Sequence, residues 1–300
     1  VDGVGVTLDF SLDGRRAAVA LGDSSISLRD ARSGEEWKRL PQRLPPNSLR
    51  FSPSGEALAV PGRHSAAVPL IEAGTGRVRK SFRHTDIVHD AAFSPDGAHL
   101  ATASSSGRVY VWDVERGELQ STLEGHRGSA VSVAFTPDGR WLVTSIGAEY
   151  RFWEPGRWES HHLVQREGAG DTTGPMAFTG DGKLMALARS RSLVELVDPA
   201  TGRSVARLEA PSSKGANDLA FSPSGARLAV VIGLGWIQLW DLRRIRERLA
   251  EVGLDWELPS LPARAPGVEP GPSASMWTSA TCPAGSPPSR RSPSRRLAAR

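Results

Sequence analysis

The stretch from Phe93 to Asp113 reads FSPDGAHLATASSSGRVYVWD, and it decides the fold because both of its ends recur along the chain. In its opening Phe-Ser-Pro-Asp-Gly, Pro presets φ, Asp can hydrogen-bond nearby backbone and Gly tolerates positive φ, which predicts a tight reversal. Two runs with β-forming residues follow, HLATAS and VYVWD, and the loop around Gly107 separates them. The stretch therefore predicts a turn followed by two short strands.

Both ends of this stretch occur six times. The first anchor recurs every 41 to 43 residues, at Phe10 (FSLDG), Phe51 (FSPSG), Phe93 (FSPDG), Phe135 (FTPDG), Phe178 (FTGDG) and Phe221 (FSPSG). The central residue of a second anchor follows each Phe by 18 to 20 residues, and these anchors begin at Leu28 (LRD), Leu70 (LIE), Val111 (VWD), Phe152 (FWE), Leu196 (LVD) and Leu239 (LWD). Two anchors in fixed phase indicate an internal structural repeat.

Each repeat has the pattern of four short strands. The first strand ends at the anchor Phe, as in AVSVAF, where alternation places Val131, Val133 and Phe135 on one face. The second and third strands follow, and another Gly turn leads to a fourth strand such as ELQSTLEG. Four antiparallel strands per repeat of about 40 to 45 residues are typical of a propeller blade. We therefore predict an all-β fold, a β-propeller of six four-stranded blade repeats.

From about Val4 to Asp241, these repeats resemble the WD-repeat β-propeller family through their period, their turns and their VWD or LWD endings. The family also has a Gly-His pair before the first strand, which Gly125-His126 matches and which His84 matches in part. The resemblance further implies a turn Asp between the second and third strands that links the His to a Ser or Thr and a Trp. The first repeat has Asp23 there, whereas others have Ser106, Gly147 and Arg191. We expect a degraded polar network and packing that depends mainly on apolar burial.

The two ends of the repeat region predict incomplete closure. The sixth repeat stops at its third strand, which would leave a strand edge exposed. We therefore expect either missing upstream blades, which we prefer, or a closing device. The six repeats would then be an incomplete ring or part of a seven-bladed ring. Residues 1–241 form the predicted propeller. Residues 242–260 form an amphipathic helix and packing segment, in which Asp241 is the N-cap, Leu242, Ile245, Leu249 and Val252 make an apolar stripe and Gly253 follows the end. Residues 261–300, rich in Pro, Ser and Arg, are predicted to be disordered.

Composition argues against several function classes. The net charge of +4 comes from the tail, where the last 40 residues hold six arginines and one acid, so the rest is nearly neutral and no specific nucleic-acid partner is expected. The single Cys282 excludes an internal disulfide, and the seven histidines form no metal-binding motif. No nucleophile elbow, phosphate loop or kinase motif occurs. We expect no membrane span, no cofactor, no metal and no catalytic residue, and a cytoplasmic location.

The loops between second and third strands, and those before each first strand, should open on one rim of the propeller. The basic side chains predicted there form a candidate protein-interaction rim: Arg63, His64, Arg83, His84, Arg108, His126, Arg127, Arg189 and Arg191. Arg is frequent at protein interfaces. We predict a non-catalytic scaffold that binds proteins or peptides.

Two alternatives stay open at this stage. The ending LWDLRRIRERLAEVGLDW resembles that of bacterial proteins in which a WD-repeat region follows a serine/threonine kinase, so the propeller could sense a ligand for a kinase domain absent from this chain. A propeller that is itself an enzyme would need a cluster of His and carboxylates in its central channel.

Overall fold

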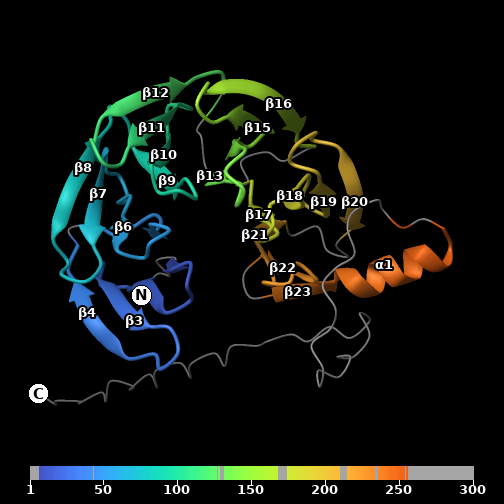
Figure 1. Cartoon of the computed structure of the whole chain (residues 1–300), viewed down its shortest axis with the longest axis horizontal. Helices are drawn as coiled ribbons and strands as arrows, with labels where there is room; N and C mark the ends of the chain where they lie inside the picture. Colours follow the sequence, from blue (N-terminus) through green and yellow to red (C-terminus); the bar gives the residue numbers. More distant parts are fainter. Residues whose placement is uncertain are drawn as a thin grey trace, which may run out of the picture.

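The computed structural model describes residues 7–42, 44–126, 128, 132–167, 174–209, 215–233, 236–253 and 255. Its strands form six antiparallel sheets arranged as the blades of a ring, with one helix outside the ring (Figure 1). The predicted six-bladed β-propeller is confirmed. Within each sheet the strands pair in chain order, so the first strand lines the centre and the last lies at the periphery.

The blades follow the repeats one to one. Blade 1 contains β1 (Leu8–Phe10), β2 (Arg16–Ala20), β3 (Ile26–Asp30) and β4 (Glu36–Leu40), and blade 2 contains β5 (Arg50–Phe51), β6 (Ala57–Ala59), β7 (Ala67–Glu72) and β8 (Val78–Arg83). Blade 3 contains β9 (Val88–Phe93), β10 (His99–Ser104), β11 (Val109–Asp113) and β12 (Leu119–Leu123), and blade 4 contains β13 (Ser132–Phe135), β14 (Leu142–Ser145), β15 (Glu149–Glu154) and β16 (Glu159–Gln165). Blade 5 contains β17 (Met176–Phe178), β18 (Met185–Ala188), β19 (Leu193–Val197) and β20 (Ser204–Glu209), and blade 6 contains β21 (Ala216–Phe221), β22 (Arg227–Ile232) and β23 (Trp236–Asp241).

The turn that joins the first two strands has the predicted chemistry. In blade 3, the Ser94 hydroxyl and the backbone N–H of Ala98 both donate to the Asp96 carboxylate, and Gly97 has a φ of 73°. The glycine at this place in every blade has a φ between 65° and 73°, a region that side chains with a Cβ rarely occupy. The repeated Gly is therefore a requirement of the turn.

Apolar side chains are buried between neighbouring blades. Because side chains alternate across a strand, one face of each sheet contacts the preceding blade and the other contacts the following blade. Five buried apolar clusters result, joining blades 1 and 2, 2 and 3, 3 and 4, 4 and 5, and 5 and 6. Leu196 of β19, for example, is fully buried against Leu228 and Val230 of blade 6.

Among the described residues, no such cluster joins blade 6 to blade 1, and we call this gap the seam. The sheet of blade 6 has three strands, as its sequence predicts, so β23 pairs with β22 alone in the described chain. Ile237 and Leu239 of β23 are 58% and 56% exposed. Leu196, which occupies the place of Leu239 in the repeat of blade 5, is fully buried. Leu8 and Phe10 of β1 are exposed on the other side. The seam is thus bordered by apolar side chains that elsewhere in the ring are covered.

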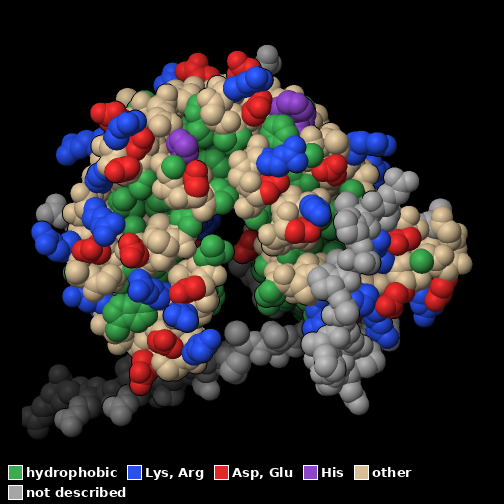
Figure 2. Space-filling model, viewed as in Figure 1, with side chains coloured by type: hydrophobic (Ala, Val, Ile, Leu, Met, Phe, Trp, Pro, Cys, Tyr) green, Lys and Arg blue, Asp and Glu red, His purple; other side chains and the backbone are tan. Residues whose placement is uncertain are grey.

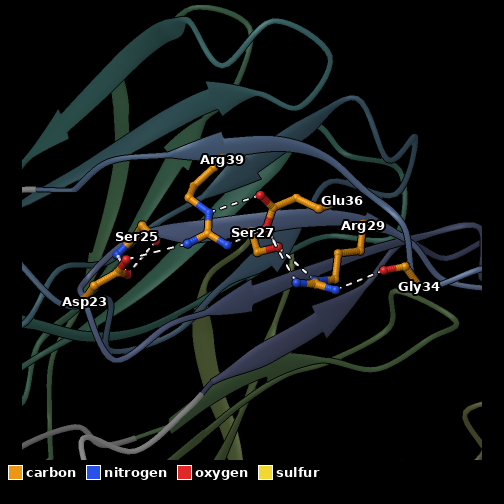
Figure 3. Close-up of polar contacts among 7 residues, drawn as sticks. All are labelled: Asp23, Ser25, Ser27, Arg29, Gly34, Glu36 and Arg39. Carbon is orange, nitrogen blue, oxygen red and sulfur yellow. Dashed lines mark hydrogen bonds and ion pairs between the residues drawn. The ribbon is translucent and has the colours of Figure 1, made fainter.

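The outer part of blade 1 carries a chain of polar contacts (Figure 3). Glu36 on β4 accepts from the Ser27 hydroxyl and from Arg39, whose guanidinium also lies 3.7 Å from Asp23. Arg29 donates to the Ser27 oxygen at 2.9 Å. The hydrogen bonds from Arg39 and Ser27 lower the pKa of Glu36 to about 2. Other blades place Trp112, Trp153 or Trp240 where blade 1 has Arg29, so this part of blade 1 is polar instead of apolar.

The predicted C-terminal helix is present as α1 (Leu242–Glu251). The Asp241 side chain accepts from the backbone N–H of Arg244 at 3.1 Å, and Gly253 follows the helix with a φ of 71°. Leu242 is buried and Ile245 packs against the apolar cluster between blades 5 and 6, whereas Val252 at the end of the predicted stripe is 66% exposed. No helix in the described part of the chain has the length and apolar character needed to cross a membrane. The predicted tail, residues 261–300, lies outside the described residues.

Candidate interaction face

The strand order divides the loops between two ends of the propeller. Antiparallel strands place the loops between second and third strands, and those leading to the next blade, at one end, which we call the loop face. Backbone hydrogen bonds join these loops: the N–H of Arg63 donates to the carbonyl of Pro45, and that of Glu167 donates to the carbonyl of Arg189. The opposite end holds the Gly turns. Figure 2 shows one end of the ring, with a hollow at its centre.

Four of the predicted basic residues are exposed on the loop face without an acidic partner. Arg63 and His64 lie in the loop between β6 and β7, Arg83 ends β8, and Arg191 lies in the loop between β18 and β19. Within the described part of the chain, no carboxylate oxygen comes within 4.0 Å of these side chains. The charges of Arg63, Arg83 and Arg191 are therefore available to a partner.

Other predicted arginines are already paired. Arg108 is exposed but lies 3.2 Å from Glu124. Arg189 is held by Glu195, whose side chain is almost fully buried, at 3.0 Å, and by Glu167 at 3.5 Å. Arg189 is thus part of the framework that joins two loops. Arg127, the remaining arginine of the predicted rim, lies outside the described residues.

The imidazole of His126 points into blade 4, which corrects its predicted place on the rim. Its Nε2 lies 2.7 Å from the Thr144 hydroxyl, and its Nδ1 lies 3.2 Å from Glu149. The Nε1–H of Trp153 donates to the same Thr144 oxygen at 2.8 Å. Burial lowers the pKa of His126. The hydrogen bonds are all satisfied when Nδ1–H donates to Glu149 and Nε2 accepts from Thr144.

This network also corrects the prediction that the polar links are degraded. Gly147 occupies the expected Asp position in blade 4, but Glu149, two residues later, supplies the carboxylate. Glu149 also accepts from Arg151 at 2.7 Å. Sequence comparison with a fixed Asp position missed Glu149 because the loop before β15 is shorter and a longer side chain reaches the same histidine.

In blade 3 the degraded network is observed. His84 Nε2 lies 2.8 Å from the Thr102 hydroxyl, and Trp112 Nε1–H donates to Thr102 at 3.1 Å, but His84 Nδ1 is buried without a partner among the described residues. Ser106 stands at the Asp position and bonds Ser104 instead. Burial lowers the pKa of His84. His84, like His126, is an internal residue of its blade and not part of the exposed rim.

The sequence did not identify the charged residues of the central channel. This channel has a volume of about 960 Å³ and is lined by the first strands of the blades. Asp9 and Arg50 directly precede an anchor Phe, and Asp90 and Asp218 stand three residues before one. A charged residue within a predicted first strand was the sequence feature that could have indicated them. His89 also lines the channel together with Asp9, Asp90 and Asp218, and it has no hydrogen bond to a carboxylate within the described chain.

The fold and the loop geometry define a β-propeller with basic side chains on its loop face and charged side chains in its channel. Comparison with known proteins shows to which type of repeat its blades belong. Residues 76–113 and 117–149, in blades 2 to 4, match the model of the WD domain, G-beta repeat. The chain therefore carries WD repeats, as the sequence resemblance predicted.

Several curated proteins are similar over part of the chain. An uncharacterized WD repeat-containing protein of Synechocystis is 35% identical over 146 residues, covering 47% of this chain and 41% of the relative. The chromatin assembly factor 1 subunit FAS2 homolog of Oryza sativa is 33% identical over 46% of this chain and 31% of the relative. The small ribosomal subunit protein RACK1 of Caenorhabditis elegans is 27% identical over 36% of this chain and 34% of the relative. The matched stretches span less than half of each of these relatives.

Proposed function

We propose that this chain is a non-catalytic scaffold that binds proteins or peptides through its loop face. The observation that carries the proposal is the set of exposed basic side chains on that face, Arg63, Arg83 and Arg191, which have no ion pair within the described chain. Arginine heads of this kind form charge-assisted hydrogen bonds with carboxylates of a partner. The names of two relatives, a chromatin assembly factor subunit and a ribosomal subunit protein, describe members of larger assemblies, which supports a scaffold role.

A charge-reversal experiment tests the loop face. The chain is immobilised and partners are recovered from an extract of the source cells, with the triple variant Arg63→Glu, Arg83→Glu and Arg191→Glu beside the native chain. We expect recovery of specific partners to fall at least about tenfold, because attraction becomes repulsion at three positions.

The matched control changes the opposite face by the same charge. Arg32, Arg77 and Arg140 are exposed on the Gly-turn end and have no ion pair within the described chain. Their triple change to Glu should leave recovery unchanged. Equal recovery by the native chain and the loop-face variant would overturn the proposal. The kinase-linked alternative stays a prediction from the sequence.

A further inference from the structure

The outer edge of β23 has no neighbouring strand in the described part of the chain. β22 pairs with one edge of β23, and the other edge is open. α1 packs beside β22 and not along this open edge: the N–H of Leu242 donates to the carbonyl of Ala226, and Ile245 packs against the apolar cluster between blades 5 and 6. An open edge presents backbone N–H and C=O groups on which a further strand can pair.

The edge of β23 also lacks the charged side chains that protect three of the other outermost strands. These strands, β4, β8 and β20, carry Glu36, Lys38, Arg39, Arg79, Lys80, Arg83, Arg207 and Glu209. Residues 236–240 of β23 are all uncharged, and Trp236, Ile237 and Leu239 are 46%, 58% and 56% exposed. Because charges on an edge strand prevent pairing with other chains, their absence here favours an edge that pairs with a partner.

Gln238 gives a second, independent indication of a partner strand. Glu195 occupies the same place in blade 5, and Arg207 of the next strand, which lies directly opposite, donates to it at 3.2 Å. In blade 6 the described chain places no strand opposite Gln238, and its Oε1 is buried without a hydrogen-bond partner among the described residues. Buried polar side-chain atoms are nearly always hydrogen-bonded, so this oxygen marks a missing donor beside the edge of β23.

The sequence of β23 is complementary to itself in an antiparallel pair. When the pair is centred on Gln238, this residue lies opposite the same residue of a second copy. Ile237 of each copy then lies opposite Leu239 of the other, and Trp236 lies opposite Trp240, so apolar side chains contact apolar side chains. The side-chain amide of each Gln238 can donate to the Oε1 of the other, which supplies the missing partner.

We propose that this chain forms a two-fold symmetric dimer in which the edges of two β23 strands pair antiparallel. The three-stranded sheets of the two sixth blades join into one continuous sheet, and each copy contributes the same patch, as in other two-fold symmetric interfaces. Antiparallel pairing reverses the strand direction, so the loop faces of the two copies point to opposite sides. If the loop face binds proteins as proposed above, one dimer therefore holds two partner molecules on opposite sides.

Light scattering after gel filtration, over a range of protein concentrations, tests the dimer and its register. The mass of the full chain should rise from that of one copy toward that of two as the concentration increases. Gln238→Glu and Gln238→Lys should each raise the dissociation constant of the dimer at least about tenfold, because two like charges then face each other at the symmetry axis. An equimolar mixture of these two variants should associate again, since a Glu of one copy then faces a Lys of the other.

A second variant and a matched control separate dimerisation from folding. Ile237→Lys changes a side chain that is exposed in the single copy, so the ring should still fold while association weakens by a similar factor. Gln120→Glu and Gln120→Lys, at an exposed glutamine on the outermost strand β12, should leave association unchanged.

Three outcomes would overturn the dimer: the mass of one copy at every concentration, undiminished association of Ile237→Lys, or a mixture of the two Gln238 variants that stays dissociated. Melting temperatures at low concentration show that each variant is folded. The loop-face experiment changes no residue of β23, so either proposal can fail while the other holds.

Discussion

One hydroxyl, that of Thr144, joins a histidine and a tryptophan inside blade 4. It is fully buried, and it donates a hydrogen bond to His126 Nε2 while its oxygen accepts one from Trp153. A buried donor or acceptor that loses its partner costs about 1 to 3 kcal/mol. Thr144 therefore contributes to stability mainly because it prevents the buried His126 and Trp153 nitrogens from losing their hydrogen-bond partner.

The variant Thr144→Val tests this view. Val has nearly the same shape, so packing is kept while the Trp153 N–H and His126 Nε2 lose their partner. We expect the free energy of unfolding in urea to fall by about 2 to 4 kcal/mol. Thr122→Val, an exposed position on β12, is the control and should change it by less than about 0.5 kcal/mol. A loss at Thr144 no larger than at Thr122 would contradict the assigned network.

Glu36 predicts an acid-sensitive contact in blade 1. Its pKa is lowered from 4.5 to about 2 by Arg39 and Ser27, so its charged form stabilises the folded state above about pH 4.5, and this contribution disappears as the pH falls toward 2. The variant Glu36→Gln should melt at a lower temperature than the native chain at pH 7, with the difference shrinking between pH 4.5 and 2. Glu56→Gln, at an exposed position on a Gly turn, is the control and should lower the melting temperature at pH 7 by less than Glu36→Gln does.

At the scale of elements, the sequence predicted the turns, strands and helix whose positions depend on backbone chemistry and on the periodicity of apolar residues. The six Gly turns, the strands beside them and α1 with its Asp241 cap occur where their local patterns placed them, because each is determined by residues a few positions apart. Contacts between loops were harder to predict. Glu149 replaces an expected Asp from a different position, and Arg189 is drawn inward by Glu195, a partner within the same sheet that no motif indicates.

The same distinction applies to the site. Arg63 and Arg191 lie in loops between second and third strands, and Arg83 is the last residue of β8; all three are exposed, and their role in binding stays a prediction. The channel residues Asp9 and Asp218 belong to blades 1 and 6, which are far apart in the sequence, so their shared surroundings appear only when the ring is assembled. Residues brought together by the circular arrangement of the blades are not related by any local spacing, and one sequence alone cannot pair them.

At the scale of the whole molecule, the ring repeats one kind of interface five times, and the described residues form no such interface at the seam. Each of the five clusters buries third-strand side chains of one blade against the next. Leu196 and Leu239 occupy the same place in their repeats, yet Leu196 is fully buried and Leu239 is 56% exposed. The same substitution at these two leucines therefore compares a position inside an interface between blades with the equivalent position at the seam.

Replacing each leucine by Ala measures what one interface contributes to stability. Leu196→Ala should lower the free energy of unfolding by about 2 to 5 kcal/mol, because it leaves a cavity between blades 5 and 6. Leu239→Ala should lower it by less than about 1 kcal/mol, because its side chain is already in contact with water. Urea denaturation of the full chain at low concentration gives both values. A large loss at Leu239 would mean that the seam is covered in solution, and repeating the measurement over a range of protein concentrations would then show whether a second copy covers it, since stability gained by association rises with concentration.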